Sequence, residues 1–163
     1  MEVKKITQII EKKYPGMVLD SCIQFNDEII IIGKDDLYDI VKFLMEEPYS
    51  FTMLLDLTCV DYKGDDERFE MVYHLFSLKT NQRIRIKIRL PEKDPEIKTL
   101  TGFWKNANWL EREVYDMFGV KFSGHPDLRR LFMYDGFEGY PLRKEYPLRK
   151  QQPIIPMRKK DDD

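Results

Sequence analysis

Apolar residues at helical spacing predict two amphipathic helices in the first third of the chain, one that ends before Pro15 and one that begins after Asp36. The first helix carries Val3, Ile6, Ile9 and Ile10, and the second carries Leu37, Ile40, Val41, Leu44 and Met45. Between them, residues 17–24 and 28–32 predict two strands around the turn pair Asn26-Asp27. A helix, a hairpin and a second helix are therefore expected in this order.

Strand patterns dominate residues 51–90. Residues 51–61 are mostly apolar and predict a central strand, and residues 69–78 predict the next one. Residues 83–90 alternate strictly, as in a half-buried antiparallel strand. Its apolar face holds Ile84, Ile86, Ile88 and Leu90, and its basic face holds Arg83, Arg85, Lys87 and Arg89. No aromatic residue interleaves the basic ones for base stacking, so this row is interpreted as a solvated or partner-facing surface.

Two more helices are predicted after the strands. Asp94-Pro95 begins a short helix within residues 91–101, because proline suits the first helical position. The other helix covers residues 108–118 and ends at Gly119, which can adopt a left-handed C-cap. Early and late helices around a run of strands predict an α+β fold. We expect a mixed or antiparallel sheet of about five strands with helices packed on it.

The tail after Gly119 has no periodic pattern and is interrupted by proline and glycine. It is nevertheless rich in large side chains, namely Phe122, Leu128, Leu131, Phe132, Met133, Tyr134, Phe137, Tyr140, Leu142, Tyr146 and Leu148. Disordered segments have low hydrophobicity. The chain is therefore divided into a globular α+β domain, residues 1–119, and an extended partner-binding arm, residues 120–163.

The composition fits one soluble domain: 163 residues, a net charge of −2, 34% charged and 42% hydrophobic residues. Such a charge favours no nucleic acid partner. No apolar run approaches the ~20 residues that span a bilayer, and no signal core begins the chain. We expect a cytoplasmic chain without direct membrane insertion. Two cysteines cannot hold an iron–sulfur cluster, which needs about four thiolates; Cys22 and Cys59 are expected to be buried and reduced, as is usual in the cytoplasm.

The second half of the chain carries a series of motifs at fixed spacing. They are Glu111-Arg112-Glu113, Asp116, Phe118-Gly119, Gly-His-Pro-Asp-Leu-Arg-Arg at residues 124–130 and Glu-Gly-Tyr-Pro-Leu-Arg-Lys at residues 138–144. Together with Trp104 and residues 107–110, this stretch resembles the C subunit of NADH-quinone oxidoreductase, which is the 30 kDa subunit family of respiratory complex I. The first half resembles the family only in its order of elements.

The resemblance implies a non-catalytic assembly subunit of the peripheral arm of that complex, on the cytoplasmic side of the cell membrane. Such a protein binds the D subunit, which helps to form the quinone site, and neighbouring peripheral-arm subunits, and it holds no cofactor itself. FMN, iron–sulfur clusters and quinone belong to the whole complex, which passes electrons from NADH to quinone and translocates ions. An equivalent subunit of an energy-converting membrane-bound hydrogenase, or of another donor–quinone complex, remains an alternative.

Two groups of site residues are predicted. The arm mixes charges of both signs with aromatic residues, which favours a protein partner; its predicted partner-binding residues are Arg129, Arg130, Tyr140, Arg143, Tyr146 and Arg149. The residues predicted to brace helix and arm are Glu111, Arg112, Glu113 and His125. Arg112 is expected to pair with Asp116 four residues later. Glu111 and Glu113 are expected to accept bonds from arginines of the arm.

A free-standing enzyme that uses His125 with Glu111 and Glu113 is the alternative of a different class. Helical residues two apart point to different sides, so the two carboxylates cannot converge on one bond. His125 and His74 have no nucleophile or metal-ligand spacing near them. His125 is expected to anchor a turn. No catalytic, cofactor-binding or metal-binding residue is therefore assigned.

Overall fold

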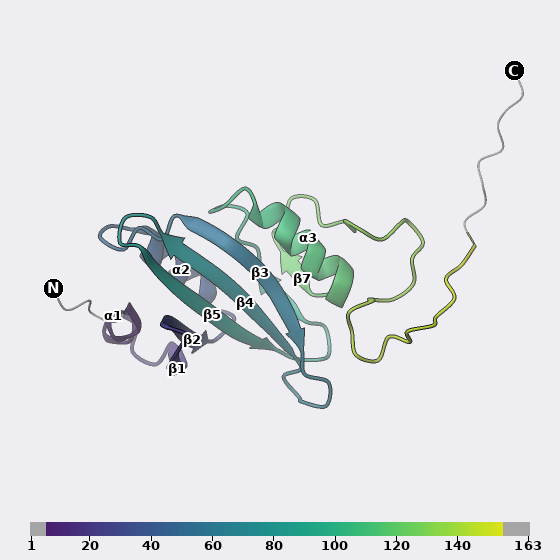
Figure 1. Ribbon diagram of the computed structural model, residues 1–163, viewed down its shortest axis with the longest axis horizontal. Coiled ribbons are helices and arrows are strands. Elements are labelled where there is room, and N and C mark those ends of the chain that lie inside the picture. Colours follow the sequence, from purple (N-terminus) through teal and green to yellow (C-terminus); the bar gives the residue numbers. More distant parts are fainter. Residues whose placement is uncertain (1–5, 155–163) are drawn as a thin grey trace, which may run out of the picture.

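The computed structural model describes residues 6–154 (Figure 1). Its helices are α1 (Ile6–Lys13), α2 (Leu37–Met45) and α3 (Ala107–Phe118). Its strands are β1 (Val18–Gln24), β2 (Asp27–Ile32), β3 (Met53–Asp61), β4 (Phe69–Ser77), β5 (Gln82–Leu90), β6 (Glu96–Lys98) and β7 (Lys121–Ser123). Val3 of the first predicted helix and residues 155–163 of the arm lie outside the described residues.

The main sheet has five strands in the order β1-β2-β5-β4-β3. Neighbouring strands run antiparallel except β2 and β5, which pair in parallel from Glu28 opposite Ile84 to Ile31 opposite Lys87. The sheet is therefore mixed, and the predicted α+β fold is confirmed. β5 is antiparallel to β4, as its alternation predicted, but parallel to its other neighbour.

The prediction of a central strand for residues 51–61 is wrong, because β3 is an edge strand. Its apolar content reflects two environments. Leu54 and Leu57 are buried under the helical layer, whereas Leu55 and Val60 are 44% and 37% exposed. α3 packs against β3, so this edge strand buries one apolar face as fully as a central strand does.

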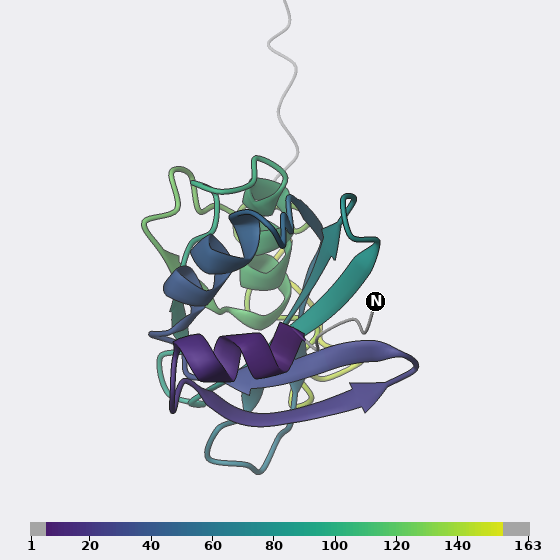
Figure 2. The same ribbon diagram turned by 90° about the vertical axis from the view of Figure 1, so that its left-hand side faces the viewer.

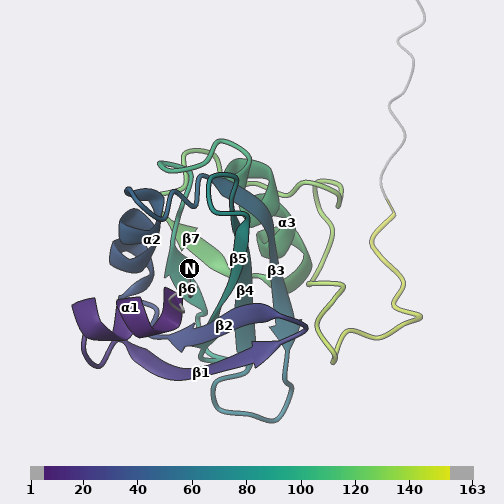
Figure 3. The ribbon, with the colours of Figure 1, turned by 60° about the vertical axis from the view of Figure 1, so that its left-hand side comes forward.

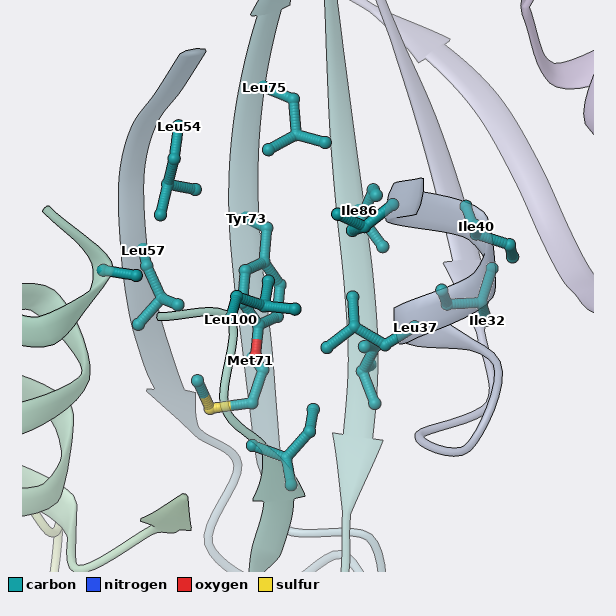
Figure 4. Packing of buried hydrophobic residues seen from close by; sticks show 14 of the residues in the cluster. Ile32, Leu37, Ile40, Leu54, Leu57, Met71, Tyr73, Leu75, Ile86 and Leu100 are labelled. Carbon is teal, nitrogen blue, oxygen red and sulfur yellow. The ribbon is translucent and has the colours of Figure 1, made fainter. Parts of the chain in front are cut away.

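The core lies on one face of the sheet. Figure 4 shows Leu37 and Ile40 of α2 beside Ile32 of β2. In the same view Leu100, from the segment before α3, lies over Tyr73 of β4. In Figure 3, the small sheet of β6 and β7 lies between α2 and α3. None of the three helices between residues 6 and 154 is long and apolar enough to cross a bilayer.

The helix predicted after Asp94-Pro95 is absent from the structure, which has strand β6 there. Asp94 has a φ of 55°, a left-handed conformation that does not lead into a helix with Pro95 at its first position. Ile97 is buried at 2% exposure, and β6 pairs in parallel with β7. A long-range strand partner thus overrides the local helix signal. β7 belongs to the segment assigned to the arm, yet Phe122 is buried in the core.

α3 ends as predicted. Gly119 has a φ of 76°, and its N–H donates to the carbonyl of Tyr115. The expectation of two buried cysteines is half wrong. Cys59 is buried, which raises the pKa of its thiol to about 12, but Cys22 is exposed because β1 forms the other edge of the sheet with little cover.

Candidate partner interface

Asp116, on the buried side of α3, is the point at which the arm turns back onto the domain. Its Oδ1 accepts from Nη1 of Arg130 at 2.7 Å. Its Oδ2 accepts the backbone N–H groups of Leu131, Phe132 and Met133 at 3.0, 2.7 and 2.9 Å. Burial alone would raise the pKa of Asp116, but these hydrogen bonds outweigh it and hold the pKa below its ordinary value. Asp116 thus holds four consecutive arm residues.

Arg112, one helical turn before Asp116 on α3, binds the same part of the arm. Its Nε and Nη2 donate to the carbonyl oxygens of Arg129 and Arg130, both at 3.0 Å. Its guanidinium lies 5.0 Å from the ring centre of Trp109. The predicted ion pair between Arg112 and Asp116 is therefore wrong, since both side chains bind the arm instead of each other.

A second anchor lies at the end of α3. Nε of Arg143 donates to the carbonyl of Phe118 at 2.6 Å, and its guanidinium lies over the rings of Tyr140 and Phe69 at 4.6 and 5.0 Å. Gly119 allows this contact in two ways. It adopts the positive φ without a steric cost, and a Cβ at this position would lie 2.5 Å from the Tyr140 ring.

A third anchor joins the arm to the ends of β3 and β4. Arg68, 2% exposed, makes two hydrogen bonds to Asp61 at 2.6 and 2.7 Å and also pairs with Glu92 and Glu145. Asp61 accepts the backbone N–H of Lys144 at 2.7 Å. The hydrogen bonds from Arg68 and then from Lys144 lower the pKa of Asp61 against the effect of burial. Two arm residues are thus tied to a buried ion pair of the domain.

Glu111 does not meet the arginines of the arm, contrary to the expectation from the sequence. Its side chain is fully buried and accepts from the Thr99 hydroxyl at 2.5 Å and the Leu100 N–H at 2.7 Å. Burial raises the pKa of Glu111 to about 7, although both hydrogen bonds act in the opposite direction. Glu113 points to solvent, and within residues 6–154 no arginine pairs with it.

His125 fixes a turn next to Glu111. Its Nδ1 accepts the N–H of Asp127 at 3.0 Å, so the proton of the neutral ring lies on Nε2, which faces the carbonyl of Asn108 at 3.3 Å. Oε2 of Glu111 is 4.0 Å from this Nε2, and both side chains have no exposed surface. A substrate cannot reach either group, which argues against the enzyme that uses His125 and Glu111.

The remaining predicted residues differ in their surroundings. Arg129 is 72% exposed in its side chain and pairs with Asp127 on the surface, and Arg149 is exposed. Tyr146 is half-buried and stacked on Phe137 with ring centres 6.0 Å apart. Large apolar side chains of α3 and the arm also face solvent, at exposures of 58% for Trp109, 61% for Phe132, 54% for Leu142, 98% for Leu148 and 94% for Ile154. These large apolar side chains gain little from burial within the chain, which favours an interface with a partner.

The family model of the respiratory-chain NADH dehydrogenase 30 kDa subunit matches residues 30–152. The chain belongs to this family. It is 51% identical over 115 residues to the C 2 subunit of NADH-quinone oxidoreductase from Rhizobium meliloti (strain 1021). That match covers 70% of the chain but only 63% of the relative, so the chain spans less than two thirds of that protein's length.

Two solved structures share the fold of this 30 kDa family chain. One is the trypsin-resistant fragment (1–134) of Nqo5, with 30% identity and a TM-score of 0.64 over 78% of this chain and 100% of that one. The other is the membrane-bound sulfane sulfur reductase, an archaeal respiratory membrane complex, with 25% identity and a TM-score of 0.73 over 88% and 84%. Within residues 6–154 of this chain, no group of three or more His, Cys, Asp or Glu side chains could hold a metal ion.

Sequence reasoning missed the residues that hold the arm in this 30 kDa family chain. Asp116 belongs to the family motif, but the only contact predicted for it was with Arg112, although an acidic residue on a buried helical face needs several donors. Arg68 and Asp61 gave no signal, because a charge at the end of a strand is usually solvated. They pair directly with each other, and their contacts with the arm are to Lys144 and Glu145, which follow long after them in the chain.

Proposed function

We propose that this chain is a non-catalytic assembly subunit of the peripheral arm of NADH-quinone oxidoreductase, complex I. It binds the D subunit of the quinone site and neighbouring peripheral-arm subunits on the cytoplasmic side of the membrane. FMN, iron–sulfur clusters and quinone are carried elsewhere in the complex. The observation that carries the proposal is an arm held in one path by the buried groups Asp116 and Arg68 while its apolar side chains face outward.

The predicted arm residues contribute to partner binding in two ways. Arg129 and Arg149 are exposed, so they contact the partner directly beside the outward apolar side chains. Arg130, Arg143, Tyr140 and Tyr146 bind the domain or the arm itself, so they contribute by fixing the shape of the interface. An arm that is ordered before it meets its partner loses less conformational entropy on binding.

We also propose that the globular part folds without most of the arm. The solved Nqo5 structure is a trypsin-resistant fragment (1–134), which supports a compact domain in the family that persists without the segment after it. In the present chain the compact part extends through β7, because Phe122 packs in the core. A protein that ends shortly after Phe122 is expected to unfold in one cooperative thermal transition.

The test of partner binding is a dissociation constant for the purified D subunit. Phe132→Ala and Arg129→Ala are expected to weaken binding about 30-fold or more, since truncation of an interface anchor typically costs more than ~2 kcal/mol. Leu19→Ala is the matched control, because Leu19 is 67% exposed on β1, away from the arm. The proposal fails if the arm variants bind the D subunit as tightly as the parent chain while the melting temperatures agree.

An equivalent subunit of another respiratory membrane complex is the second candidate. The likeness to the sulfane sulfur reductase complex, which covers 88% of the chain, favours it. Purification of the native complex through a tag on this chain, followed by assays with NADH and with other electron donors, distinguishes the two. Oxidation of NADH by the purified complex supports the first function, and its absence beside activity with another donor supports the second.

A further inference from the structure

The two edges of the main sheet differ in how far their main chains are covered. Beside β3, Nε1 of Trp104 donates to the carbonyl of Thr52 at 2.9 Å. Nδ2 of Asn106 donates to the carbonyl of Leu54, also at 2.9 Å. At the other edge, every residue of β1 after Val18 is exposed, and Figure 2 shows the hairpin of β1 and β2, in purple, at the rim of the molecule. An open edge strand can pair with another chain, so β1 is the edge to which a partner strand can add.

The open part of the β1 edge is its second half. Near the start of β1 the register with β2 shifts, and farther along the N–H of Ser21 already donates to Oδ1 of Asp20 at 2.7 Å. Both features hinder the pairing of a further strand there. Gln24 lies opposite Asp27 at the closed end of the hairpin, and the alternation of an antiparallel ladder then directs the main-chain groups of Ile23 outward. Ile23 is therefore the residue whose N–H and C=O are both open to a partner strand.

A hollow of about 380 Å³ lies beside this open part of the edge. Gln8 and Glu11 of α1 line it together with Ser21 and Ile23 of β1, and Ile23 is 54% exposed. Alternate side chains of a strand point to the same face of a sheet. A strand added next to β1 would therefore direct every second side chain toward α1, as β1 does with Ser21 and Ile23. The hollow can accommodate one of these side chains.

The hollow carries a negative charge that the described part of the chain does not balance. Its seven lining residues include two carboxylates, those of Glu11 and Glu28, and no lysine, arginine or histidine. Glu28 accepts hydrogen bonds from N–H groups and a hydroxyl at the start of α1, which are neutral donors. Of the lysines in α1, Lys13 lies 4.0 Å from the ring centre of Phe43, and Lys12 does not line the hollow. Within residues 6–154 neither carboxylate pairs with a basic side chain, so a basic group of a partner complements this charge.

We propose that the second half of β1 binds an extended strand of a partner protein, and that a lysine or arginine of this strand enters the hollow beside α1. The strand pairs with the N–H and C=O of Ile23, as in other complexes in which a peptide extends a sheet at its edge. Its basic side chain reaches Glu11, which is exposed, and Glu28, which is half-buried. The site includes neither the arm nor its anchors, so it does not depend on the function proposed for the arm.

The test uses the full chain and a short blocked peptide in which valine alternates with lysine. A second peptide has glutamate in place of each lysine. Binding is followed by the amide resonances of β1 and by their hydrogen exchange. We expect saturable binding of the lysine peptide with a dissociation constant below ~1 mM, and binding at least tenfold weaker for the glutamate peptide. The exchange of the Ile23 amide is expected to slow at least tenfold at saturation because its N–H gains an acceptor, whereas the amide of Cys22, which faces β2, is expected to change little.

Main-chain pairing is tested with two further lysine peptides, one methylated at the nitrogens of the valines and one at the nitrogens of the lysines. Successive N–H groups of a strand face opposite edges, so one of these sets faces β1 and the other faces away. One methylated peptide is therefore expected to bind like the unmethylated peptide, and the other at least tenfold more weakly. A contact made through side chains alone would not distinguish the two.

Three variants of the chain test the charge and the identity of the occupant. Glu11→Lys is expected to weaken binding of the lysine peptide at least tenfold and to remove its advantage over the glutamate peptide. Glu113→Lys is the matched control, because Glu113 is an exposed glutamate on α3 and the change in charge is the same. A variant that lacks residues 1–5 is expected to bind the lysine peptide as the full chain does.

Several results would overturn the proposal. Absence of saturable binding by the lysine peptide, or equal binding of the glutamate peptide, contradicts the stated chemistry of the partner. Equal binding of the two methylated peptides, or an unchanged exchange rate of the Ile23 amide, shows that no strand adds to β1. Binding that appears only after residues 1–5 are removed would make the N-terminus of the chain itself the occupant. Each of these results leaves the measurements on the arm and its partner unaffected.

Discussion

Replacement of Glu111 by glutamine tests the electrostatics of the buried junction between α3 and the segment before it. Burial raises the pKa of Glu111 from 4.5 to about 7. The folded chain therefore binds this proton more tightly than the unfolded chain does. The stabilisation from the proton is fully present below the unfolded pKa and is lost as the pH rises through the folded pKa of about 7. Glutamine cannot release a proton and removes this dependence.

The size of the effect follows from the two pKa values. With 4.5 in the unfolded chain and about 7 in the folded chain, the parent loses about 1.3 kcal/mol of stability between pH ~6 and pH ~8. For a chain of this size that corresponds to about 3–5 °C in melting temperature. The Glu111→Gln variant also loses an acceptor for Thr99 or Leu100, which costs about 1 kcal/mol at every pH. A series of pH values distinguishes the two effects, because the lost hydrogen bond lowers the stability of the variant equally at every pH, whereas the proton effect changes the stability of the parent with pH.

The assay is urea denaturation of parent and variant at a series of pH values. The pKa of His74 is lowered by burial and by Arg85, so its contribution is lost as the pH falls, but it is common to both proteins and cancels in their difference. A His125→Asn background removes the imidazole whose Nε2 lies 4.0 Å from Oε2 of Glu111. The variant is expected to be less stable than the parent at pH ~4, where the proton stabilisation is still present, and more stable than the parent at pH ~8, where it has been lost. A difference that stays constant across this range would refute the reasoning.

Three further predictions concern the anchors and the thiols. Gly119→Ala is expected to destabilise the chain by about 2 kcal/mol and to speed trypsin cleavage of the arm, because the new Cβ meets Tyr140; an unchanged cleavage rate would contradict this. Arg68→Ala is expected to cost about 3–5 kcal/mol in urea denaturation, since it leaves a buried carboxylate unpaired; a loss below ~1 kcal/mol would show that the ion pair is replaceable. Replacement of Cys22 and Cys59 by alanine is expected to leave the electron transfer of the assembled complex intact, and a missing iron–sulfur signal would refute it.

Local sequence patterns correctly predicted the features that depend on residues within the element itself. The strict alternation of residues 83–90 gave β5, and Gly119 gave the end of α3. Long-range partners decided the elements that were predicted wrongly. β6 is a strand because β7 pairs with it, and β3 is mostly apolar at a sheet edge because α3 covers one face.

The motif residues of the second half identified the family, but their contacts could not be predicted from the sequence. The motif around Glu111, Arg112 and Asp116 identified the family, but spacing on a helix suggested only that Arg112 and Asp116 pair. In the structure each binds backbone groups of the arm. Backbone carbonyl and amide groups have no signal of their own in a sequence. A buried charge on a helix can therefore be recognised from sequence, but its partners cannot.

The parallel pairing of β2 with β5 has a consequence for the order of folding. β3, β4 and β5 form a meander with short connections, whereas β2 must find β5 across both of the strands that intervene in the chain. Closing short loops first costs less entropy, so we expect the meander to form before the N-terminal hairpin docks on it. During synthesis the hairpin leaves the ribosome first. The edge of β2 that pairs with β5 then stays unpaired until β5 has been made, and for that time this isoleucine-rich edge is exposed to chaperones and to aggregation.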